Sequence, residues 1–279
     1  MNARVGLLQV RIDSGETVID RIHRVVAVTR NCADGRFDDI EVVAAEGIDA
    51  TRHPDLLVLP ELWTVGAFDA EGMLSNPESI DGGLVSRLKE VARDTGTWIH
   101  AGSIPEWAFD GSRYNTAVLI SPGGAVDAVY RKVHLFGFDE GEAVLLEAGS
   151  DLVVRPTPLG ATGLATCYDL RFPELFRGLL DAGSETFLIT SGWPLARIEH
   201  WRVLLRARAI EDQAWVVACN QVGTHAGVTL GGRSTVVDPS GELVIEAPAE
   251  GECLVLADVD PSAVARVRTA FPVLRDRRL

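Results

Sequence analysis

The 279-residue sequence lacks the short motifs of several common enzyme classes. It contains no dinucleotide-binding G-x-G-x-x-G, no phosphate-binding G-x-x-x-x-G-K-[ST] and no G-x-S-x-G, so it carries no signature of a nucleotide-dependent enzyme or of an α/β-hydrolase. Its six histidines include no H-x-x-x-H pair. Nothing in the sequence therefore points to a metal site, and no cofactor is expected.

Positive charge is scarce. Lys and Arg number 26 against 40 Asp and Glu, which gives a formal net charge of −14, and no dense stripe of basic residues occurs. A nucleic-acid-binding surface needs such a stripe. We therefore expect no nucleic-acid partner and attribute the acidity to solubility.

Long apolar runs and paired cysteines are also missing. No apolar run reaches the roughly 20 residues that a membrane helix needs, and the first residues lack the apolar core and cleavage site of a signal peptide. The four cysteines, Cys32, Cys167, Cys219 and Cys253, lie far apart and form no C-x-x-C pair. We expect a cytoplasmic protein with free thiols and no membrane association.

What the sequence contains is an alternation of short apolar runs and amphipathic stretches. The apolar runs are rich in Val, Ile and Leu and predict buried strands at residues 5–10, 55–59, 97–104, 114–120, 125–133, 163–167, 186–191, 214–220, 234–237, 242–246 and 253–259. Apolar stripes with helical spacing predict helices over residues 17–32, 81–94, 172–182 and 198–212. The alternation indicates a layered α/β fold. Because repeats and linkers are absent, we expect one domain over residues 1–279.

One apolar run, "GLATC" at residues 163–167, ends in a thiol. The chain continues as "YDLRFPELF", in which Pro173 suits the first turn of a helix. Free amides and partial positive charge near a helix start favour the reactive thiolate, and the same amides can hold an oxyanion. Cys167 is therefore a candidate nucleophile, and a buried structural cysteine is the alternative.

Two other apolar runs end in a charged residue. "LLVLPELW" at residues 56–63 makes Glu61 either a solvated residue at a strand end or a general base in a partly dry site. "YRKVHLF" at residues 130–136 makes Lys132 either a surface lysine or a cation that stabilises a thiolate and a tetrahedral oxyanion. In a sheet with parallel neighbours the three strand ends can converge. Cys167 would then attack a carbonyl or nitrile carbon, and the glutamate would carry its proton to leaving ammonia.

These three segments resemble, in order, the signature segments of the carbon–nitrogen hydrolase (nitrilase) superfamily, and residues 193–223 resemble the helix–strand segment that follows them. The resemblance implies that Glu61 is the base, Lys132 the partner of thiolate and oxyanion, and Cys167 the nucleophile. The family often has a second glutamate between the lysine and the cysteine, here Glu142, with Glu140 as the alternative. The resemblance also implies a four-layer αββα sandwich that pairs with a second subunit, so a homodimer or higher homo-oligomer is expected.

Within the superfamily, "CYDLRFPEL" and "HWRVLLRARAIE" are most similar to the amidase branch that includes ω-amidase, which hydrolyses 2-oxoglutaramate and related dicarboxylic monoamides. True nitrilases typically carry Trp-Glu after the cysteine, where this chain has Tyr168 and Asp169. The resemblance implies a small primary amide that is cleaved to a carboxylate and ammonia through a cysteine thioester. Deaminated-glutathione amidase, N-carbamoyl amidase, aliphatic amidase and a non-catalytic binding protein on this fold are the alternatives.

Tyr168, Arg171 and Trp193 are the candidate substrate-binding residues. Arg171 suits a substrate carboxylate, but it equally suits an ion pair with Asp169 or Glu174. Trp193 either forms a wall of the pocket or serves only in packing.

Two departures and one rival site leave questions open. "SGWP" at residues 191–194 and Asp212 depart from the Asn-Trp-Pro and Glu-Asn-Gln patterns of bacterial relatives. The first departure touches the pocket and leaves the substrate undecided, whereas the second lies on a predicted helix. The rival is a papain-type site with Cys167 and His134 or His200, which gives the glutamate and the lysine no role.

Overall fold

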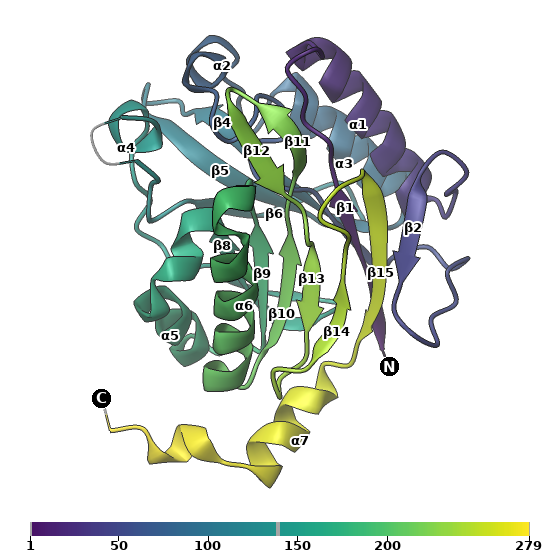
Figure 1. The fold of residues 1–279 in the computed structure, drawn as a ribbon, viewed down its shortest axis with the longest axis vertical. Coiled ribbons are helices and arrows are strands. Elements are labelled where there is room, and N and C mark those ends of the chain that lie inside the picture. Colours follow the sequence, from purple (N-terminus) through teal and green to yellow (C-terminus); the bar gives the residue numbers. More distant parts are fainter. Residues whose placement is uncertain (1, 138–139, 279) are drawn as a thin grey trace.

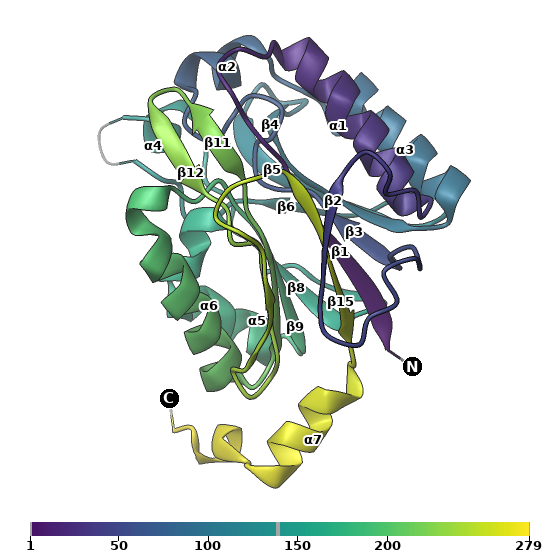
Figure 2. The ribbon, with the colours of Figure 1, turned by 45° about the vertical axis from the view of Figure 1, so that its right-hand side comes forward.

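Two mixed β-sheets lie face to face, and helices cover the outer side of each sheet (Figures 1 and 2). The structure is a computed structural model that describes residues 2–137 and 140–278. The first sheet has seven strands in the order β2 (Glu41–Ala44), β15 (Cys253–Val259), β1 (Ala3–Gln9), β3 (Leu56–Val58), β4 (Trp98–Trp107), β5 (Arg113–Ile120) and β6 (Val126–Arg131). The second has six in the order β14 (Leu243–Glu246), β13 (Thr235–Val237), β10 (Trp215–Cys219), β9 (Thr186–Thr190), β8 (Gly160–Thr166) and β7 (Val154–Thr157).

Two pairs of helices form the outer layers. Helices α1 (Val18–Ala33) and α3 (Gly83–Thr95) pack on the first sheet, and α5 (Pro173–Asp181) and α6 (Ile198–Asp212) pack on the second (Figure 2). The predicted four-layer αββα sandwich is therefore confirmed. The remaining elements are α2 (Ala70–Ser75), α4 (Glu142–Leu145), α7 (Ser262–Ala270) and a separate hairpin of β11 (Val222–His225) and β12 (Val228–Gly231). In the described ranges, no helix combines the length and the apolar character that crossing a membrane requires.

The strands are apolar on both faces because each sheet is covered on both sides. In β9, Leu188 faces the other sheet, whereas Phe187 and Ile189 pack under α5 and α6. Burial of this kind is the main favourable term in folding, at about 25 cal/mol per Å² of apolar surface. Strands that are apolar on both faces appear in the sequence as continuous apolar runs, and the central strands could therefore be predicted from it.

The elements that the sequence patterns did not predict are short or partly exposed, namely β2, β7, β11, β12, α2, α4 and α7. Strand β7 contains Pro156, which lacks an amide donor and is tolerated because β7 is an edge strand. Elements this short offer too few residues for a periodic pattern to be recognised in the sequence. A turn at residues 238–242 joins β13 to β14, where the amide of Gly241 donates to the carbonyl of Asp238 (2.9 Å).

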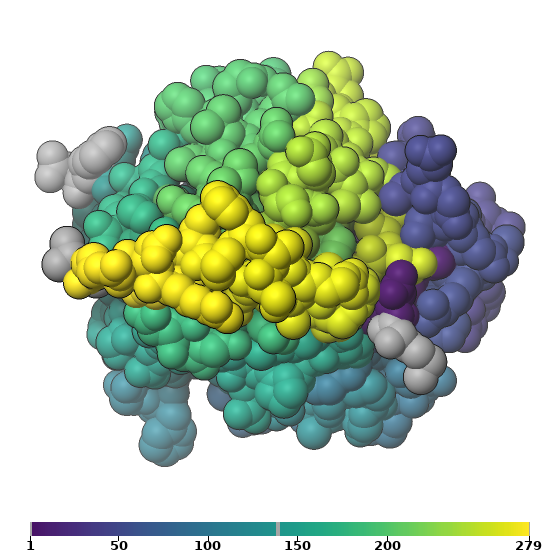
Figure 3. All heavy atoms as spheres, turned by 90° about the horizontal axis from the view of Figure 1, so that it is seen from below, coloured from purple at the N-terminus to yellow at the C-terminus, as the bar shows by residue number. Residues whose placement is uncertain are grey.

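The carboxyl-terminal segment lies across one end of the sandwich, shown in yellow in Figure 3. Trp215 Nε1 donates to the carbonyl of Asp260 (3.0 Å), and Gln213 Nε2 donates to the carbonyl of Phe271 (2.7 Å). Trp215 begins β10, so this segment contacts the amino end of the three parallel strands β8, β9 and β10. Their carboxyl ends lie at the opposite end, where the polar residues described below gather.

A bulge in β4 holds the chain on both sides of Glu61. The pairing of β4 with β5 shifts register between His100 and Ser103. At this bulge, the amide of Ser103 donates to the carbonyl of Pro60 (3.3 Å), and its hydroxyl accepts from the amide of Leu62 (3.0 Å). The bulge therefore positions the glutamate from a neighbouring strand.

Replacing the glycine of this bulge tests its role. Gly102 has φ +67, and a Cβ there would collide with the backbone carbonyl of Pro60. Gly102→Ala should lower the free energy of unfolding by about 2 kcal/mol or more, because it combines left-handed backbone strain with a clash against atoms that cannot rotate away. Urea denaturation measures the loss. Gly47→Ala is the matched control, since Gly47 has φ +76 and no atom within 4 Å of the added Cβ. Equal losses in both variants would contradict the close approach.

Candidate active site

Lys132 lies between two buried carboxylates. It follows β6 directly, and its Nζ donates to Glu61 Oε1 (2.7 Å) and to Glu142 Oε2 (2.6 Å). Asn115 of β5 donates from Nδ2 to both glutamates, at 2.9 Å to Glu61 Oε1 and also to Glu142 Oε1. All four side chains are buried. Two predicted site residues and the predicted second glutamate therefore form one hydrogen-bonded cluster.

Backbone amides complete the cluster. The amide of Gly192, which follows β9, donates to Glu61 Oε2 (2.9 Å), and the amide of Phe136 donates to Glu142 Oε2 (3.0 Å). A buried carboxylate is tolerated only when charges and donors satisfy it. Glu140 is exposed and is not part of the cluster, so Glu142 is the glutamate that the fold places beside Lys132.

Cys167 reaches the same site from the second sheet. It follows β8 and begins a 3₁₀ turn (Cys167–Arg171), with φ +49, a left-handed conformation that costs a non-glycine residue about 1 to 3 kcal/mol. Thr166 and Asp169 form a capping box around the turn. The expected convergence within one sheet is therefore wrong in one respect, because Glu61 and Lys132 come from the first sheet and Cys167 comes from the sheet facing it.

Asp169 joins the lysine segment to the cysteine segment. Its carboxylate accepts from the hydroxyl of Tyr130 (2.6 Å), from the backbone amide of His134 (2.9 Å) and, at 2.8 Å, from His134 Nδ1. Tyr130 and His134 lie two residues before and two residues after Lys132, and Asp169 lies two residues after Cys167. One buried carboxylate thus fixes the position of both segments.

The electrostatics of the site keep the thiol protonated. Burial, followed by the negative charge of Glu61, raises the pKa of Cys167 well above its ordinary value, although the ammonium of Lys132 opposes the shift. Burial also lowers the pKa of Lys132, but the carboxylates of Glu142 and Glu61 outweigh it and hold this pKa well above its usual range. Burial raises the pKa of Glu142. Burial therefore opposes the stabilisation of the thiolate that a nearby helix start was expected to give, and the helix itself begins only at Pro173, beyond the 3₁₀ turn.

A small cavity opens onto this cluster. The three predicted substrate-binding residues, Tyr168, Arg171 and Trp193, all line it. The complete lining is Glu61, Ala67, Phe68, Lys132, Phe136, Glu142, Cys167, Tyr168, Arg171, Trp193, Pro194 and Arg197. Trp193 lines the cavity and also packs against Trp201, with ring centroids 5.5 Å apart.

Arg171 lies over aromatic rings rather than beside an acid. Its guanidinium carbon lies 4.8 Å from the ring centroid of Trp193, and its two terminal nitrogens lie 3.3 Å from His200 Nδ1. Within residues 2–137 and 140–278 it forms no ion pair with Asp169 or Glu174, because Asp169 accepts from other donors. The guanidinium therefore keeps donors that can face a ligand in the cavity.

The papain-type alternative does not fit the positions of the histidines. His134 is bonded to Asp169 through Nδ1 and stacks on Phe172 with ring centroids 3.8 Å apart. His200 is exposed and contacts Arg171. Neither histidine lines the cavity that Cys167 borders, so neither is placed to take the thiol proton.

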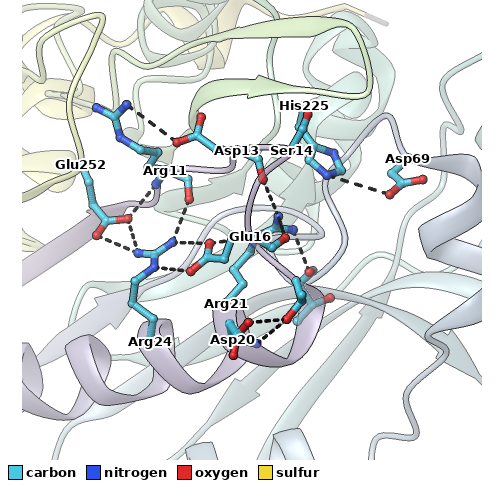
Figure 4. Close-up of polar contacts among 12 residues, drawn as sticks. Arg11, Asp13, Ser14, Glu16, Asp20, Arg21, Arg24, Asp69, His225 and Glu252 are labelled. Carbon is cyan, nitrogen blue, oxygen red and sulfur yellow. Dashed lines mark hydrogen bonds and ion pairs between the residues drawn. The ribbon is translucent and has the colours of Figure 1, made fainter.

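A buried arginine, drawn with its polar contacts in Figure 4, supports one wall of the cavity from outside. Arg21 of α1 is 1% exposed and donates to the carbonyl oxygens of Thr64 (3.0 Å) and Asp13 (3.0 Å). Thr64 belongs to the loop that continues into the lining residues Ala67 and Phe68. The loop is therefore tied to α1 and to the segment after β1.

Residues 16–269 match the carbon–nitrogen hydrolase family. The chain belongs to this family. It is 40% identical over 284 residues to the 2-oxoglutaramate amidase of Paenarthrobacter nicotinovorans. The alignment covers 98% of this chain and 89% of that protein. It is 38% identical over 229 residues to the 2-oxoglutaramate amidase of Bacillus subtilis strain 168, with 82% and 86% covered. It is also 38% identical over 236 residues to the deaminated glutathione amidase of Homo sapiens, with 80% and 72% covered.

Solved structures agree with the family assignment. A carbon–nitrogen hydrolase superfamily protein of Xanthomonas campestris, crystallised with an arsenic adduct in its active site, superposes with a TM-score of 0.84 at 28% identity. The match covers 100% of this chain and 98% of that one. The αββα sandwich of this carbon–nitrogen hydrolase is therefore the fold of its structural neighbours.

Three contributors to the site were missed by sequence reasoning. Asn115 is a lone amide in the apolar strand "YNTAVLI", and the cost of burying an amide was the available signal. Arg197 lines the cavity and lies over the ring of Phe136 at 5.6 Å, but it belongs to a charged segment that looks like ordinary surface. The amide of Gly192 carried no sequence signal, because backbone donors are common to all residues except proline.

Iodoacetamide should alkylate Cys167 in preference to the other three cysteines of this hydrolase. Cys167 is 8% exposed and borders the cavity, whereas Cys32, Cys219 and Cys253 are each 0% exposed. Because burial and Glu61 hold the thiol in its protonated form, the alkylation rate should still be rising with pH above the ordinary thiol pKa of about 8.5. Mass spectrometry of the labelled peptides measures the rate and the site.

The controls for this labelling are single substitutions. Cys167→Ala should remove the labelled peptide, and Cys253→Ala should leave it unchanged. A rate that is already maximal at neutral pH would contradict the raised pKa of the thiol.

Proposed function

We propose that this carbon–nitrogen hydrolase is an ω-amidase that cleaves the terminal amide of 2-oxoglutaramate or a related dicarboxylic monoamide. The observation that carries the proposal is that Arg171 lines the same cavity as Cys167. A guanidinium that pairs with no acid in the part of the chain that the structure describes suits a carboxylate at the far end of a small amide, which it can bind through two parallel hydrogen bonds. Arg197 adds a second guanidinium to the lining.

Two relatives support this assignment over its alternatives. Both bacterial relatives are named 2-oxoglutaramate amidases, and the first covers nearly the whole chain. Deaminated glutathione amidase, the name of the human relative, is the second candidate because its sequence is also 38% identical. A neutral aliphatic amide would leave Arg171 without a partner, which argues against a simple aliphatic amidase.

In the acylation step, Cys167 Sγ attacks the amide carbon and the carbonyl oxygen gains negative charge. Because the thiol is protonated at rest, its proton passes to Glu61 during attack and then to the leaving nitrogen. The carbon–nitrogen bond breaks and ammonia leaves. Lys132 stays charged beside the site and stabilises the oxyanion. The product of this step is a Cys167 thioester.

In the deacylation step, water attacks the thioester. Glu61 takes a proton from the water, the carbon–sulfur bond breaks to release the carboxylic acid, and the proton passes to the departing thiolate of Cys167. Glu142 holds the ammonium of Lys132 in place and is linked to Glu61 through Asn115, so it orients the base and the cation together. No metal or cofactor enters these steps.

Ammonia release from a panel of amides tests the assignment. Wild-type protein should hydrolyse 2-oxoglutaramate with a higher kcat/KM than propionamide, and Cys167→Ala should hydrolyse neither. Arg171→Lys should raise KM for 2-oxoglutaramate about tenfold or more and change propionamide hydrolysis little, since lysine cannot form the two-pronged contact. Arg266→Lys is the matched control, because Arg266 lies on α7 and pairs with Asp260.

Equal losses on both amides in Arg171→Lys would assign the arginine to the fold rather than to the substrate. A wild-type preference for neutral amides would remove the ω-amidase assignment and leave the hydrolytic chemistry intact. A preference for deaminated glutathione would favour the second candidate.

We also propose that two copies associate through the outer face of α6. Val203 (63% exposed), Ile210 (52%) and Leu243 (45%) line one shallow hollow on this face. An exposed apolar patch of this kind marks an interaction surface, and two-fold symmetry can place it against its own copy. The four cysteines are buried and free, which suits a reducing compartment, so we place the protein in the cytoplasm.

Disruption of this face should give a monomer. Wild-type protein should be at least dimeric by light scattering at micromolar concentration, and the double variant Val203→Asp, Ile210→Asp should be monomeric, because each aspartate would have to be buried without a partner. Ile19→Asp is the matched control, since Ile19 is 66% exposed on α1 and lies away from this face. An active wild-type monomer would refute the proposed association.

A further inference from the structure

Ser191 lies beside the thiol at the carboxyl ends of two neighbouring strands. Strands β8 and β9 run parallel, and Thr166 pairs with Thr190 in their register. Cys167 directly follows Thr166, and Ser191 directly follows Thr190. Adjacent strands lie about 4.8 Å apart, so the register places the serine next to the nucleophile. Ser191 belongs to the "SGWP" segment at residues 191–194. This segment departs from the pattern of bacterial relatives, and the departure left the identity of the substrate undecided.

The backbone holds Ser191 firmly in this position. Its amide donates to the carbonyl of Cys219 in β10 (2.8 Å), and the amide of the following residue, Gly192, donates to Glu61 Oε2 (2.9 Å). The serine therefore lies between a central strand and the proposed base. Ser191 is 0% exposed, so its hydroxyl cannot turn to bulk solvent.

The hydroxyl of Ser191 has no hydrogen-bond partner among the residues that the structure describes. Leaving a buried hydroxyl unpaired costs about 1 to 3 kcal/mol, so such a group calls for an explanation. A thiolate is an acceptor that forms only during the reaction. The hydroxyl lies within reach of the sulfur: burial and Glu61 raise the pKa of Cys167, whereas Lys132 and the Ser191 hydroxyl lower it.

We propose that Ser191 is a further catalytic residue, whose hydroxyl donates a hydrogen bond to Cys167 Sγ whenever the sulfur carries negative charge. The role rests on the thioester chemistry proposed above. On attack, the proton leaves Sγ for Glu61 and the sulfur–carbon bond forms, and the hydroxyl stabilises the sulfur as its proton departs. In deacylation the carbon–sulfur bond breaks, and the same hydroxyl stabilises the leaving sulfur until the proton returns. Ser191 keeps its own proton throughout.

This role separates the chemical steps from substrate binding. The hydroxyl acts on the sulfur and the substrate contacts lie at Arg171, so loss of the hydroxyl should lower kcat and leave KM nearly unchanged. Loss of a structural hydroxyl would instead lower stability without a specific effect on the thiol.

Ser191→Ala is the principal test. We expect kcat for 2-oxoglutaramate to fall about tenfold, with KM within about twofold, and the rate of Cys167 alkylation by iodoacetamide at pH 8 to fall by a similar factor. Alkylation requires no amide substrate, so it tests Ser191 even if every amide in the panel is left unhydrolysed. In Ser191→Thr, which keeps the hydroxyl, iodoacetamide should alkylate Cys167 at close to the wild-type rate.

Ser184→Ala is the matched control at the other end of the same region. Ser184 is also buried, but its hydroxyl donates to the carbonyl of Thr186 (2.8 Å) and accepts from the amide of Gly163 (3.0 Å). This variant should lower the melting temperature and leave the alkylation rate and kcat unchanged. The proposal would be overturned if Ser191→Ala kept both the alkylation rate and the kcat of the wild-type protein. An equal decrease of both quantities in Ser184→Ala would also overturn it, since it would show a structural origin.

Discussion

The ammonium of Lys132, buried between the carboxylates of Glu61 and Glu142, is the interaction on which the rest of the site depends. A buried charge is stable only where opposite charge and hydrogen bonds replace water. Two carboxylates face one ammonium. Burial, followed by the negative charge of Glu61, keeps the neighbouring thiol protonated, and neutral donors such as Asn115 and the Gly192 amide complete the coordination of the acids.

Holding this cluster in place requires both sheets. The base and the cation end strands of the first sheet, and the nucleophile ends a strand of the second. Asp169 bridges them through Tyr130 and His134, and the β4 bulge holds the chain around the base. A strained left-handed cysteine persists only where its surroundings determine its conformation, and the apolar core between the sheets provides that rigidity.

The two ends of the cavity differ in charge. The buried end holds the two glutamates, and two arginines line the cavity over the aromatic rings of Trp193 and Phe136. Cation–π contacts leave guanidinium donors available in a way that ion pairs do not. In the proposed ω-amidase, an anionic substrate is repelled from the glutamates and attracted by the arginines. The charge distribution would therefore orient its amide toward Cys167 before any specific contact forms.

The amino-acid sequence by itself determined the local features of this protein: apolar runs long enough for buried strands, the charged residues and the thiol that end them, and the alternation that makes a layered α/β fold. These follow from periodicity and burial, which neighbours in sequence share. Only the tertiary structure decided that Glu142 rather than Glu140 pairs with Lys132, that Arg171 avoids Asp169, and that Asn115, Arg197 and Ser191 belong at the site. Hydrogen bonds and desolvation depend on atoms brought together from different strands and sheets. A thiol whose local sequence context favours the thiolate is for that reason held protonated in the folded protein.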